Sequence, residues 1–416
     1  MRARQMWNKT VPTLAVMAML ALCAAAHAEP LLKAGDRMVF YGDSITEQRR
    51  YTRNVVDYFT LRYPGVDISF RNAGWTGDRV EQGMSRLDRD VLSLKPTVVS
   101  LCFGMNDGGN RAYDQEGYDR FMAGMTTIVE RLTQAGVKVV LLTPGCVDPD
   151  RSKRPGTEVY NDTLSRYSKG VLELAAKNNL PVYNINALML DVQTRAKADA
   201  TTFTMIPDSI HPNEPGAAVM SFALLRALGC TDQASGLTID AKSGKATPDR
   251  CTVKDLVAKE DSVTFTRTDQ ALPTYLAPAA RTICKYIPFD KDFNQYLFTV
   301  KSLKKGNYAL TVEGMAVGTF TADELAAGVN LGPLPGPWET LGEKVNALVV
   351  DQDNIYFHRW RNIGLARVPE EARPEFEALL AKLDVLIKAK ETERLKATAG
   401  DRAWKWELRP AAEAGQ

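Results

Sequence analysis

Short apolar runs alternate with amphipathic segments five times between residues 38 and 228. Apolar runs of four to seven residues predict buried strands, and the segments between them carry apolar residues at helical spacing. This repeated alternation predicts an α/β domain, with helices on both faces of a parallel sheet. The expected strands are Met38–Tyr41, Val66–Phe70, Thr97–Phe103, Val137–Leu142 and Pro181–Ile185.

The composition changes after Cys230. Residues 231–252 are polar and rich in turn formers, and two β-type runs, Tyr296–Val300 and Tyr308–Val312, are separated by a short loop that contains glycine. Such a pair predicts a β-hairpin, and Val317–Phe320 is a further expected strand. We therefore expect a small β-rich accessory domain in the second half of the chain.

A stretch rich in glycine and proline at residues 332–337 predicts a linker, and the chain beyond it has helical periodicity. A chain of 416 residues is long enough for two or three domains. The expected parts are a leader at residues 1–28, the sheet domain at 29–229, the β-rich region at 230–336 and a C-terminal helical region at 337–416.

The leader has the three parts of a secretory signal peptide. Arg2, Arg4 and Lys9 form a basic start, an apolar run follows, and residues 26–28 (Ala-His-Ala) provide a small-residue cleavage site. The expected location is therefore the periplasm or the extracellular space. No later segment is apolar over a length that crosses a bilayer, so no stable membrane insertion is expected.

The charge balance argues against several classes of partner. The leader holds three of the 52 Lys and Arg residues and none of the 50 Asp and Glu residues, so its removal changes the formal charge from +2 to −1. A near-neutral chain has no electrostatic reason to bind nucleic acid or anionic membranes. The sequence does not indicate an oligomeric state.

Five cysteines follow the leader, and an odd number implies at least one free thiol. Cys230 and Cys251 flank the polar stretch after the sheet domain and are the expected disulfide, a loop closure that stabilises by about 3 kcal/mol. Cys102 lies in an apolar strand and is expected to be a buried small hydrophobe. There is no Cys-x-x-Cys spacing, so no zinc or redox site is expected.

Gly42-Asp43-Ser44 follows the first expected strand and directly precedes a helical segment. A hydroxyl at this point faces the crevice where open α/β sheets bind ligands. The N–H groups that open the helix point toward incipient negative charge, so Ser44 is a candidate nucleophile. The triplet by itself is also compatible with an ordinary turn in which the serine caps the helix.

Two histidines, His211 and His358, follow the leader. His211 lies three residues after Asp208, so the Asp208 carboxylate can reach the imidazole across one turn and leave Nε2 free to take a serine proton. In the alternative interpretation, Asp208 caps the next helix and His211 is a packed surface residue. His358 lies among aromatic residues and is expected to be structural or substrate-contacting.

Acyl transfer also requires hydrogen-bond donors aimed at the oxyanion that develops during the reaction. Three candidates follow neighbouring expected strands: the N–H of Ser44, the N–H of Gly74 and the side-chain amide of Asn106. Glycine at position 74 lets the backbone approach a ligand closely. Gly74 as a turn glycine and Asn106 as an Asx-turn residue are the ordinary alternatives.

The ordered set of these motifs resembles the SGNH, or GDSL, hydrolase family, in Gly42-Asp43-Ser44, Asn72-Ala-Gly74, Asn106 and Asp208-x-x-His211. The resemblance covers residues 36–228 and implies a flavodoxin-like three-layer sheet, a triad of Ser44, His211 and Asp208, and an oxyanion hole of Ser44, Gly74 and Asn106. Ile45 replaces the leucine of the family's name, a conservative change away from the chemistry. Residues 231–416 are not part of the usual domain, so the resemblance assigns them no role.

The resulting hypothesis is an exported serine esterase that hydrolyses short-chain esters, acetyl groups on a carbohydrate, through an acyl-enzyme. SGNH enzymes that deacetylate polysaccharides are the most similar functional group. Trp75 could stack on a sugar ring, and Asp43 and Asp107 are further candidate substrate contacts. Trp75 has the alternative role of a packing tryptophan. No cofactor and no metal are expected.

Other functions stay open. A lysophospholipase or thioesterase would use the same triad with a longer acyl pocket, although the polar, basic loop at residues 146–157 argues against an apolar lid. A non-catalytic glycan-binding module and an acyltransferase that uses a sugar hydroxyl are further alternatives. The shortage of histidines disfavours a two-metal phosphoesterase. The lack of Gly-x-Gly-x-x-Gly after the first strand disfavours a Rossmann cofactor site.

Overall fold

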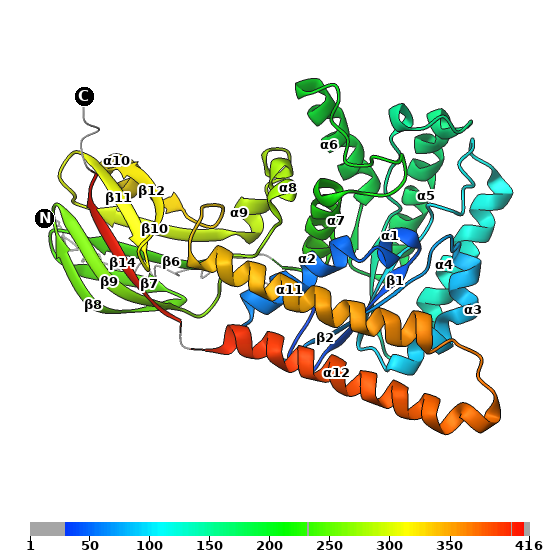
Figure 1. The fold of residues 1–416 in the computed structure, drawn as a ribbon. Coiled ribbons are helices and arrows are strands. Elements are labelled where there is room, and N and C mark those ends of the chain that lie inside the picture. The colour runs from blue at the N-terminus through cyan, green and yellow to red at the C-terminus, as the bar shows by residue number, and fades with distance from the viewer. Residues whose placement is uncertain (1–29, 231–232, 401, 412–416) are drawn as a thin grey trace, which may run out of the picture.

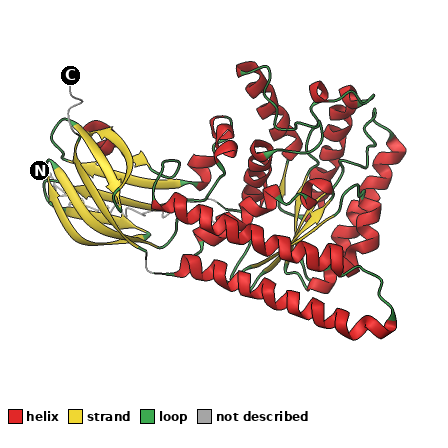
Figure 2. Ribbon diagram, viewed as in Figure 1, coloured by secondary structure: helices red, strands yellow, loops and turns green. Residues whose placement is uncertain are grey.

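The computed structural model describes residues 30–230, 233–400 and 402–411 (Figure 1). The expected leader, residues 1–28, lies outside the described residues. The chain forms a helix-covered sheet on one side and a strand-rich body on the other (Figure 2). Two long helices run from the strand-rich body along the helix-covered sheet.

The first body is built on a five-stranded sheet in which all neighbouring strands are parallel. Its strand order is β2-β1-β3-β4-β5, so the chain starts inside the sheet, adds one edge and then extends to the other. The predicted flavodoxin-like three-layer fold is therefore confirmed. The strands are β1 (Arg37–Gly42), β2 (Ser69–Gly74), β3 (Val98–Cys102), β4 (Lys138–Leu142) and β5 (Val182–Tyr183).

The long helices of this body are α2 (Arg50–Arg62), α3 (Val80–Asp90), α4 (Gln115–Gln134), α5 (Thr157–Asn178), α6 (Ile185–Asp199) and α7 (Glu214–Ala227). They cover both faces of the sheet because successive strand residues point to opposite sides. On β1, Met38 and Phe40 enter the core that includes α2 and α7. Val39 and Tyr41 enter the core that includes α3 and α4.

The strand-rich body is a pair of sheets with a core of its own. The strand orders are β13-β10-β6-β7 and β12-β11-β14-β9-β8. Phe265 and Trp406 stack on each other in the shared core, with ring centroids 5.6 Å apart. This body confirms the expected β-rich accessory region. Its strands are β6 (Gln233–Asp240), β7 (Lys245–Asp249), β8 (Cys251–Lys259), β9 (Ser262–Asp269), β10 (Gln295–Lys301), β11 (Asn307–Val312), β12 (Met315–Thr321), β13 (Val329–Asn330) and β14 (Ala403–Pro410).

The hairpin predicted for Tyr296–Val300 and Tyr308–Val312 is wrong, although both segments are strands. β10 pairs with β6 and β13 in one sheet, whereas β11 pairs with β12 and β14 in the other. The loop between them therefore crosses from one sheet to the other. Both strands bury alternate residues, and two facing sheets satisfy that pattern by turning each apolar face to a common core. The strand predicted at Val317–Phe320 is confirmed within β12.

The segment after residue 337 begins as the expected helical region, with α11 (Pro337–Phe357) and α12 (Arg373–Ala399) lying side by side (Figure 1). Both helices pack on the first body. Arg53 on α2 pairs with Asp353 at 2.8 Å, and Arg71 on β2 pairs with Glu391 at 2.7 Å. The chain then returns to the second body, where β14 lies between β11 and β9. The expectation of helix up to the C-terminus is therefore wrong for this strand.

The disulfide predicted between Cys230 and Cys251 does not form. Cys230 follows α7 and belongs to a core of the first body, while Cys251 opens β8 and belongs to the core of the second. The Sγ of Cys251 lies 3.3 Å from the carbonyl oxygen of Gly236. Cys102 on β3 is buried, as predicted.

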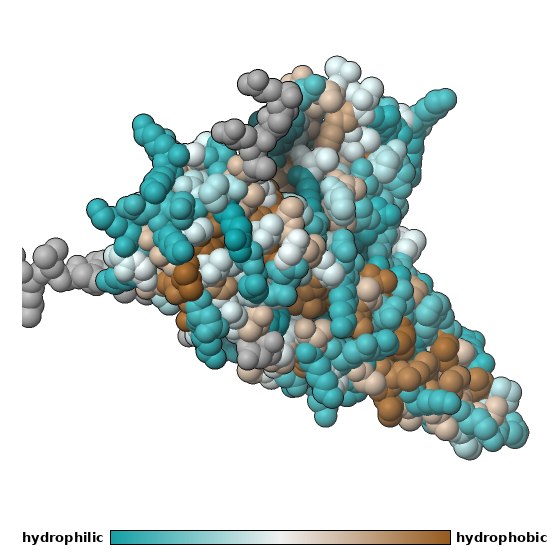
Figure 3. All heavy atoms as spheres, turned by 60° about the vertical axis from the view of Figure 1, so that its left-hand side comes forward, coloured by the Kyte–Doolittle hydropathy of each residue, from teal (hydrophilic) through white to brown (hydrophobic). Residues whose placement is uncertain are grey.

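The face of the molecule in Figure 3 is largely hydrophilic, with a hydrophobic area at its lower right. On α12, Leu379, Val385 and Leu386 are exposed large apolar side chains. Within residues 30–230, 233–400 and 402–411, no helix combines the length and the apolar character needed to cross a bilayer.

Asp57 on α2 is a buried carboxyl at the contact with α11. Its Oδ2 accepts a hydrogen bond of 2.6 Å from Asn346, while Oδ1 has no partner among the described residues. Burial raises the pKa of Asp57 to about 7, against the effect of the Asn346 hydrogen bond. The folded state therefore holds this proton more tightly than the unfolded state, whose pKa is 3.8.

This shift predicts that Asp57 lowers the free energy of unfolding as the pH rises from about 4 to about 7. The neutral side chain of Asp57→Asn cannot ionise. Between pH 4 and pH 8, the free energy of unfolding of the wild type should therefore fall by about 2–4 kcal/mol relative to that of the variant. Urea unfolding at the two pH values measures the effect. Asp119→Asn, an exposed change on α4, is the control, and equal pH dependence in both variants would contradict the prediction.

Candidate active site

Ser44 opens a short helix, α1 (Ser44–Glu47), at the end of β1. Two glycines let α1 lie directly on the strand ends. A Cβ at Gly42 would meet the Oγ1 of Thr46 at 2.3 Å, and a Cβ at Gly74 would meet the backbone N of Glu47 at 2.2 Å. Any larger residue at position 42 or 74 would push α1, and Ser44 with it, away from the sheet.

Ser44, His211 and Asp208 form one hydrogen-bonded chain. The Oγ of Ser44 lies 2.9 Å from Nε2 of His211, and Nδ1 of His211 lies 2.7 Å from Oδ2 of Asp208. Oδ1 of Asp208 accepts the N–H groups of Ile210 and His211, at 3.1 and 2.7 Å. Burial acts to raise the pKa of Asp208, but the hydrogen bonds from His211 and Ile210 outweigh it and hold the pKa below 3.8. The carboxylate is thus ionised at neutral pH and accepts the Nδ1–H of the imidazole.

The loop that carries Asp208 and His211 is anchored by a buried carboxylate, Asp148. Oδ2 of Asp148 accepts hydrogen bonds of 2.6 Å from Gln193 and Thr204, and Oδ1 pairs with Lys197 at 2.6 Å. The backbone N–H of Asp148 donates to the carbonyl of Ser209, at 3.1 Å. Ser209 itself has a left-handed φ of 74°, a conformation that this anchoring supports.

The three predicted oxyanion donors lie at the start of α1, at the end of β2 and on the loop after β3, and two of them have partners. The N–H of Gly74 donates to Oδ1 of Asn72 at 2.9 Å, and Nδ2 of Asn106 donates to the carbonyl of Asp78 at 2.8 Å. Nδ2 of Asn106 carries a second hydrogen, which can serve another acceptor. The N–H of Ser44 is the first in α1, where amides have no intrahelical acceptor.

Residues 40–219 match the GDSL-like lipase/acylhydrolase family. The part of the chain that holds the candidate site is thus a GDSL-type hydrolase domain. An acetylxylan esterase from Geobacillus stearothermophilus is 26% identical over 223 residues, which make up 47% of this chain and 95% of that protein. The GDSL-like chain described here is therefore a carboxylic ester hydrolase.

Two solved structures are similar to this GDSL-like hydrolase. One is described as a gut microbial diltiazem-metabolizing enzyme, and it matches with a TM-score of 0.78 and 22% identity over 92% of this chain and 99% of its own. The other is the acetylxylan esterase from Geobacillus stearothermophilus, with a TM-score of 0.39 and 24% identity over 47% of this chain and 95% of its own. The first match extends to the parts outside residues 40–219 and so shows the fold of nearly the whole chain.

Arg86 on α3 is a buried residue of this GDSL-like site that the sequence analysis missed. Its guanidinium donates to the carbonyls of Gly42 and Ala73, at 3.1 and 2.7 Å, and pairs with Asp78 at 2.6 Å. Asp90, one turn further along α3, lies 3.5 Å from the same group. Arg86 thus joins the ends of β1 and β2 to the loop that Asn106 contacts. The local signal was limited to the i, i+4 spacing of Arg86 and Asp90, which indicates an ion pair on a helix but not that the pair is buried.

The ring of Trp75, predicted as a candidate sugar platform, is covered by Arg361 from the C-terminal region. The Cζ of Arg361 lies 3.2 Å from the ring centroid, and the Nε of Arg361 lies 3.5 Å from Glu47 on α1. Trp360 meets Trp75 edge to face, with centroids 6.1 Å apart. Arg361 and Trp360 belong to η4 (His358–Ile363), a π-helical turn after α11. The surroundings fit a packing role for Trp75, and no local sequence signal linked it to a residue so distant in the chain.

The two other candidate substrate contacts, Asp43 and Asp107, act as helix caps. Asp43 accepts the N–H of Ile45 at 3.0 Å, and Asp107 accepts the N–H of Val80, the first residue of α3, at 2.9 Å. Burial raises the pKa of Asp43 to about 7 and that of Asp107 to about 6, against the effect of these backbone hydrogen bonds. Their contacts are those of structural groups at the floor of the site.

The second histidine, His358, lies apart from this chain of hydrogen bonds. It is exposed on η4, and its Nδ1 lies 2.8 Å from Nδ2 of Asn362. Within the described residues, no group of three or more His, Cys, Asp or Glu side chains could hold a metal ion.

Proposed function

We propose that this GDSL-like hydrolase is an exported serine esterase that removes acetyl groups from carbohydrate esters. The hydrogen-bonded chain from Asp208 through His211 to Ser44 carries the proposal. A nucleophile and its base within hydrogen-bond reach, with a third group that orients the base, is the arrangement required for nucleophilic acyl transfer.

In the proposed mechanism, Oγ of Ser44 attacks the ester carbonyl while Nε2 of His211 takes the hydroxyl proton. Asp208 holds the imidazole in the correct tautomer and stabilises the imidazolium. His211 then protonates the leaving alcohol, and an acetyl-enzyme remains on Ser44. Water, activated by His211, attacks this ester and releases acetate.

The developing oxyanion would be stabilised by the N–H of Ser44 and by the second hydrogen of the Asn106 side-chain amide. The N–H of Gly74 is bonded to Asn72 in the free protein, so it contributes by sharing that hydrogen bond or by leaving it. Such donors are effective because the folded protein holds them in place before the charge develops.

The similarity to an acetylxylan esterase, at 26% identity, supports an acetyl group as the acyl group and a carbohydrate as the substrate. The leader sequence at residues 1–28 supports export. N-terminal sequencing of the protein from the producing cell would test export, which requires a chain that begins at Glu29. A chain retained with residues 1–28 attached would contradict it.

A 4-nitrophenyl ester series from acetate to octanoate tests the proposed acyl group. We expect kcat/KM to be highest for acetate and to fall by at least about tenfold at octanoate, because a longer chain requires an acyl pocket. A maximum at octanoate would replace this proposal with a lipid or thioester substrate.

Acetylated xylan, an acetylated monosaccharide and diltiazem are the next substrates. Diltiazem belongs among them because the structure that matches nearly the whole chain is described as metabolizing it. We expect release of acetate from the carbohydrates. Appearance of the acetyl group on an added sugar, in place of free acetate, would identify an acyltransferase instead.

A further inference from the structure

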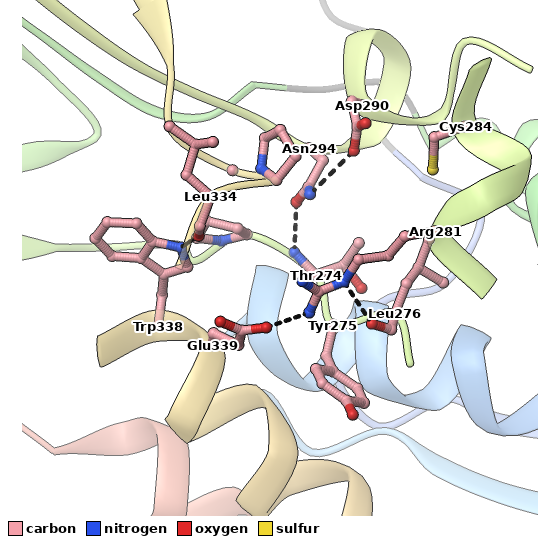
Figure 4. A pocket seen from close by; sticks show the side chains of 13 residues that line it. Thr274, Tyr275, Leu276, Arg281, Cys284, Asp290, Asn294, Leu334, Trp338 and Glu339 are labelled. Atoms are coloured by element: carbon pink, nitrogen blue, oxygen red, sulfur yellow. Dashed lines mark hydrogen bonds and ion pairs between the residues drawn. The ribbon is translucent and has the colours of Figure 1, made fainter. Parts of the chain in front are cut away.

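A cavity of about 160 Å³ lies outside residues 40–219, at the junction between the strand-rich body and α11 (Figure 4). Its walls come from the segment after β9, from the short helices α8 (Pro278–Arg281) and α9 (Phe289–Phe293), from the residues that follow β13 and from the first turn of α11. All 13 lining residues lie between positions 273 and 339, so the cavity is separate from the candidate active site.

The polar groups of this cavity are held in place by one another. Arg281 pairs with Glu339 and also donates to the carbonyl of Leu276, at 3.0 Å. Oδ1 of Asn294 accepts the N–H of Thr274 at 2.9 Å, and its Nδ2 lies 3.3 Å from Asp290. A ligand would therefore meet a preformed set of donors and acceptors, which reduces the ordering cost of binding.

The charges at the cavity favour a neutral ligand. Two carboxyl groups, those of Glu339 and Asp290, and one guanidinium, that of Arg281, line the cavity, so an anion gains no net attraction. An apolar ligand would displace water from these polar groups without offering them hydrogen bonds in return, which is costly. Hydroxyl groups satisfy both sides, since they donate to carboxylates and accept from a guanidinium.

The size of the cavity and the apolar part of its wall further limit which kind of ligand it can hold. A cavity of about 150 Å³ admits one benzene ring, so this one has room for a single six-membered ring. The side chains of Arg281 and Glu339 are 34% and 25% exposed, which opens the cavity to solvent. Leu334 and the edge of Trp338 supply an apolar surface beside the polar groups, as in sites that bind amphipathic rings.

We propose that this cavity is a binding site for one neutral sugar ring, separate from the site of ester hydrolysis. The sugar hydroxyls would bond to Glu339, Arg281 and Asn294, and its C–H face would lie against Leu334 and Trp338. In a carbohydrate esterase, such a site would hold a second unit of the substrate or its product, but binding itself does not depend on the proposed function.

Isothermal titration of the full chain with D-xylose, D-glucose and D-galactose tests the proposal, with D-glucuronate as an anionic comparison. We expect at least one neutral sugar to bind and glucuronate to bind at least tenfold more weakly. Glu339→Gln should weaken sugar binding about tenfold, because it removes a charged acceptor, and Cys284→Met should weaken it further by narrowing the cavity.

Two control variants separate this site from the rest of the molecule. Glu343→Gln, an exposed change one turn further along α11, should leave the dissociation constant unchanged. Ser44→Ala should also leave it unchanged even if esterase activity is lost, so failure of the proposed function and failure of this site are distinguishable. The proposal would be overturned if none of the three neutral sugars bound. It would also be overturned if the Glu339→Gln and Cys284→Met proteins bound sugar as tightly as the wild type.

Discussion

Replacement of Ser44 by alanine should lower kcat/KM for 4-nitrophenyl acetate by at least about 10⁴-fold. The variant lacks the hydroxyl that lies 2.9 Å from Nε2 of His211, so no acyl-enzyme forms. Residual hydrolysis would come from the oxyanion donors and from substrate binding alone. Steady-state kinetics with purified wild type and variant measure the effect, and mass spectrometry of a slow ester should show an acyl adduct in the wild type alone.

Ser85→Ala is the matched control for Ser44→Ala. Ser85 is exposed on α3 and its hydroxyl donates to the carbonyl of Gln82, so its loss should leave the kinetics unchanged. Both variants should unfold in urea at the midpoint of the wild type, because neither hydroxyl supports the core. A Ser44→Ala protein that is folded and fully active would remove the main support for the proposed mechanism. If the wild type and the variant were both folded and both without esterase activity, the glycan-binding alternative would be favoured.

Replacement of Arg86 by methionine should lower the free energy of unfolding by about 3–5 kcal/mol. The change leaves the buried carboxylate of Asp78 without its partner and removes the donors to the carbonyls of Gly42 and Ala73. Esterase activity of the folded protein should fall as well, because Gly42 precedes the helix of Ser44 and the Asp78 carbonyl holds Asn106. Urea unfolding and kcat of the folded protein are the measurements.

Arg89→Met is the control for this prediction, since Arg89 lies on the same helix, pairs with Asp90 and has a side chain that is 53% exposed. Its loss should cost about 1 kcal/mol or less, as for other exposed ion pairs. Arg86→Lys should fall between the two, because lysine keeps the charge but cannot form the same fork of hydrogen bonds. Equal stability of the Arg86→Met and Arg89→Met proteins would show that the buried network is not what holds the strand ends together.

The sheet domain could be predicted from the sequence because its information is local. The alternation of apolar strands and amphipathic helices fixes a parallel sheet, and parallel strands bring their following loops to one edge. Ser44 and His211 therefore meet across 167 residues, while Asp208 reaches His211 within a single turn. Both links follow from strand order and from short spacing, without detailed knowledge of side-chain packing.

The second half of the chain shows where local patterns are insufficient. β10 and β11 have hairpin-like sequences and a short connecting loop, but each pairs with strands distant in the chain. Alternation of apolar residues predicts which face of a strand is buried, but it does not predict with which other strand it pairs. Likewise, Cys230 and Cys251 are close in sequence but belong to different cores.

The sequence by itself determined the α/β sheet, the edge at which the polar loops gather and the spacing that aligns Asp208 with His211. The tertiary structure alone decided the strand partners of the second body, the return of β14, the cover of Arg361 over Trp75 and the burial of Arg86 between the strand ends. The physical reason for this division is the distance along the chain over which each kind of interaction acts. Periodicity and turn chemistry act over a few residues, whereas these contacts depend on which surfaces are left to bury once the local elements have formed.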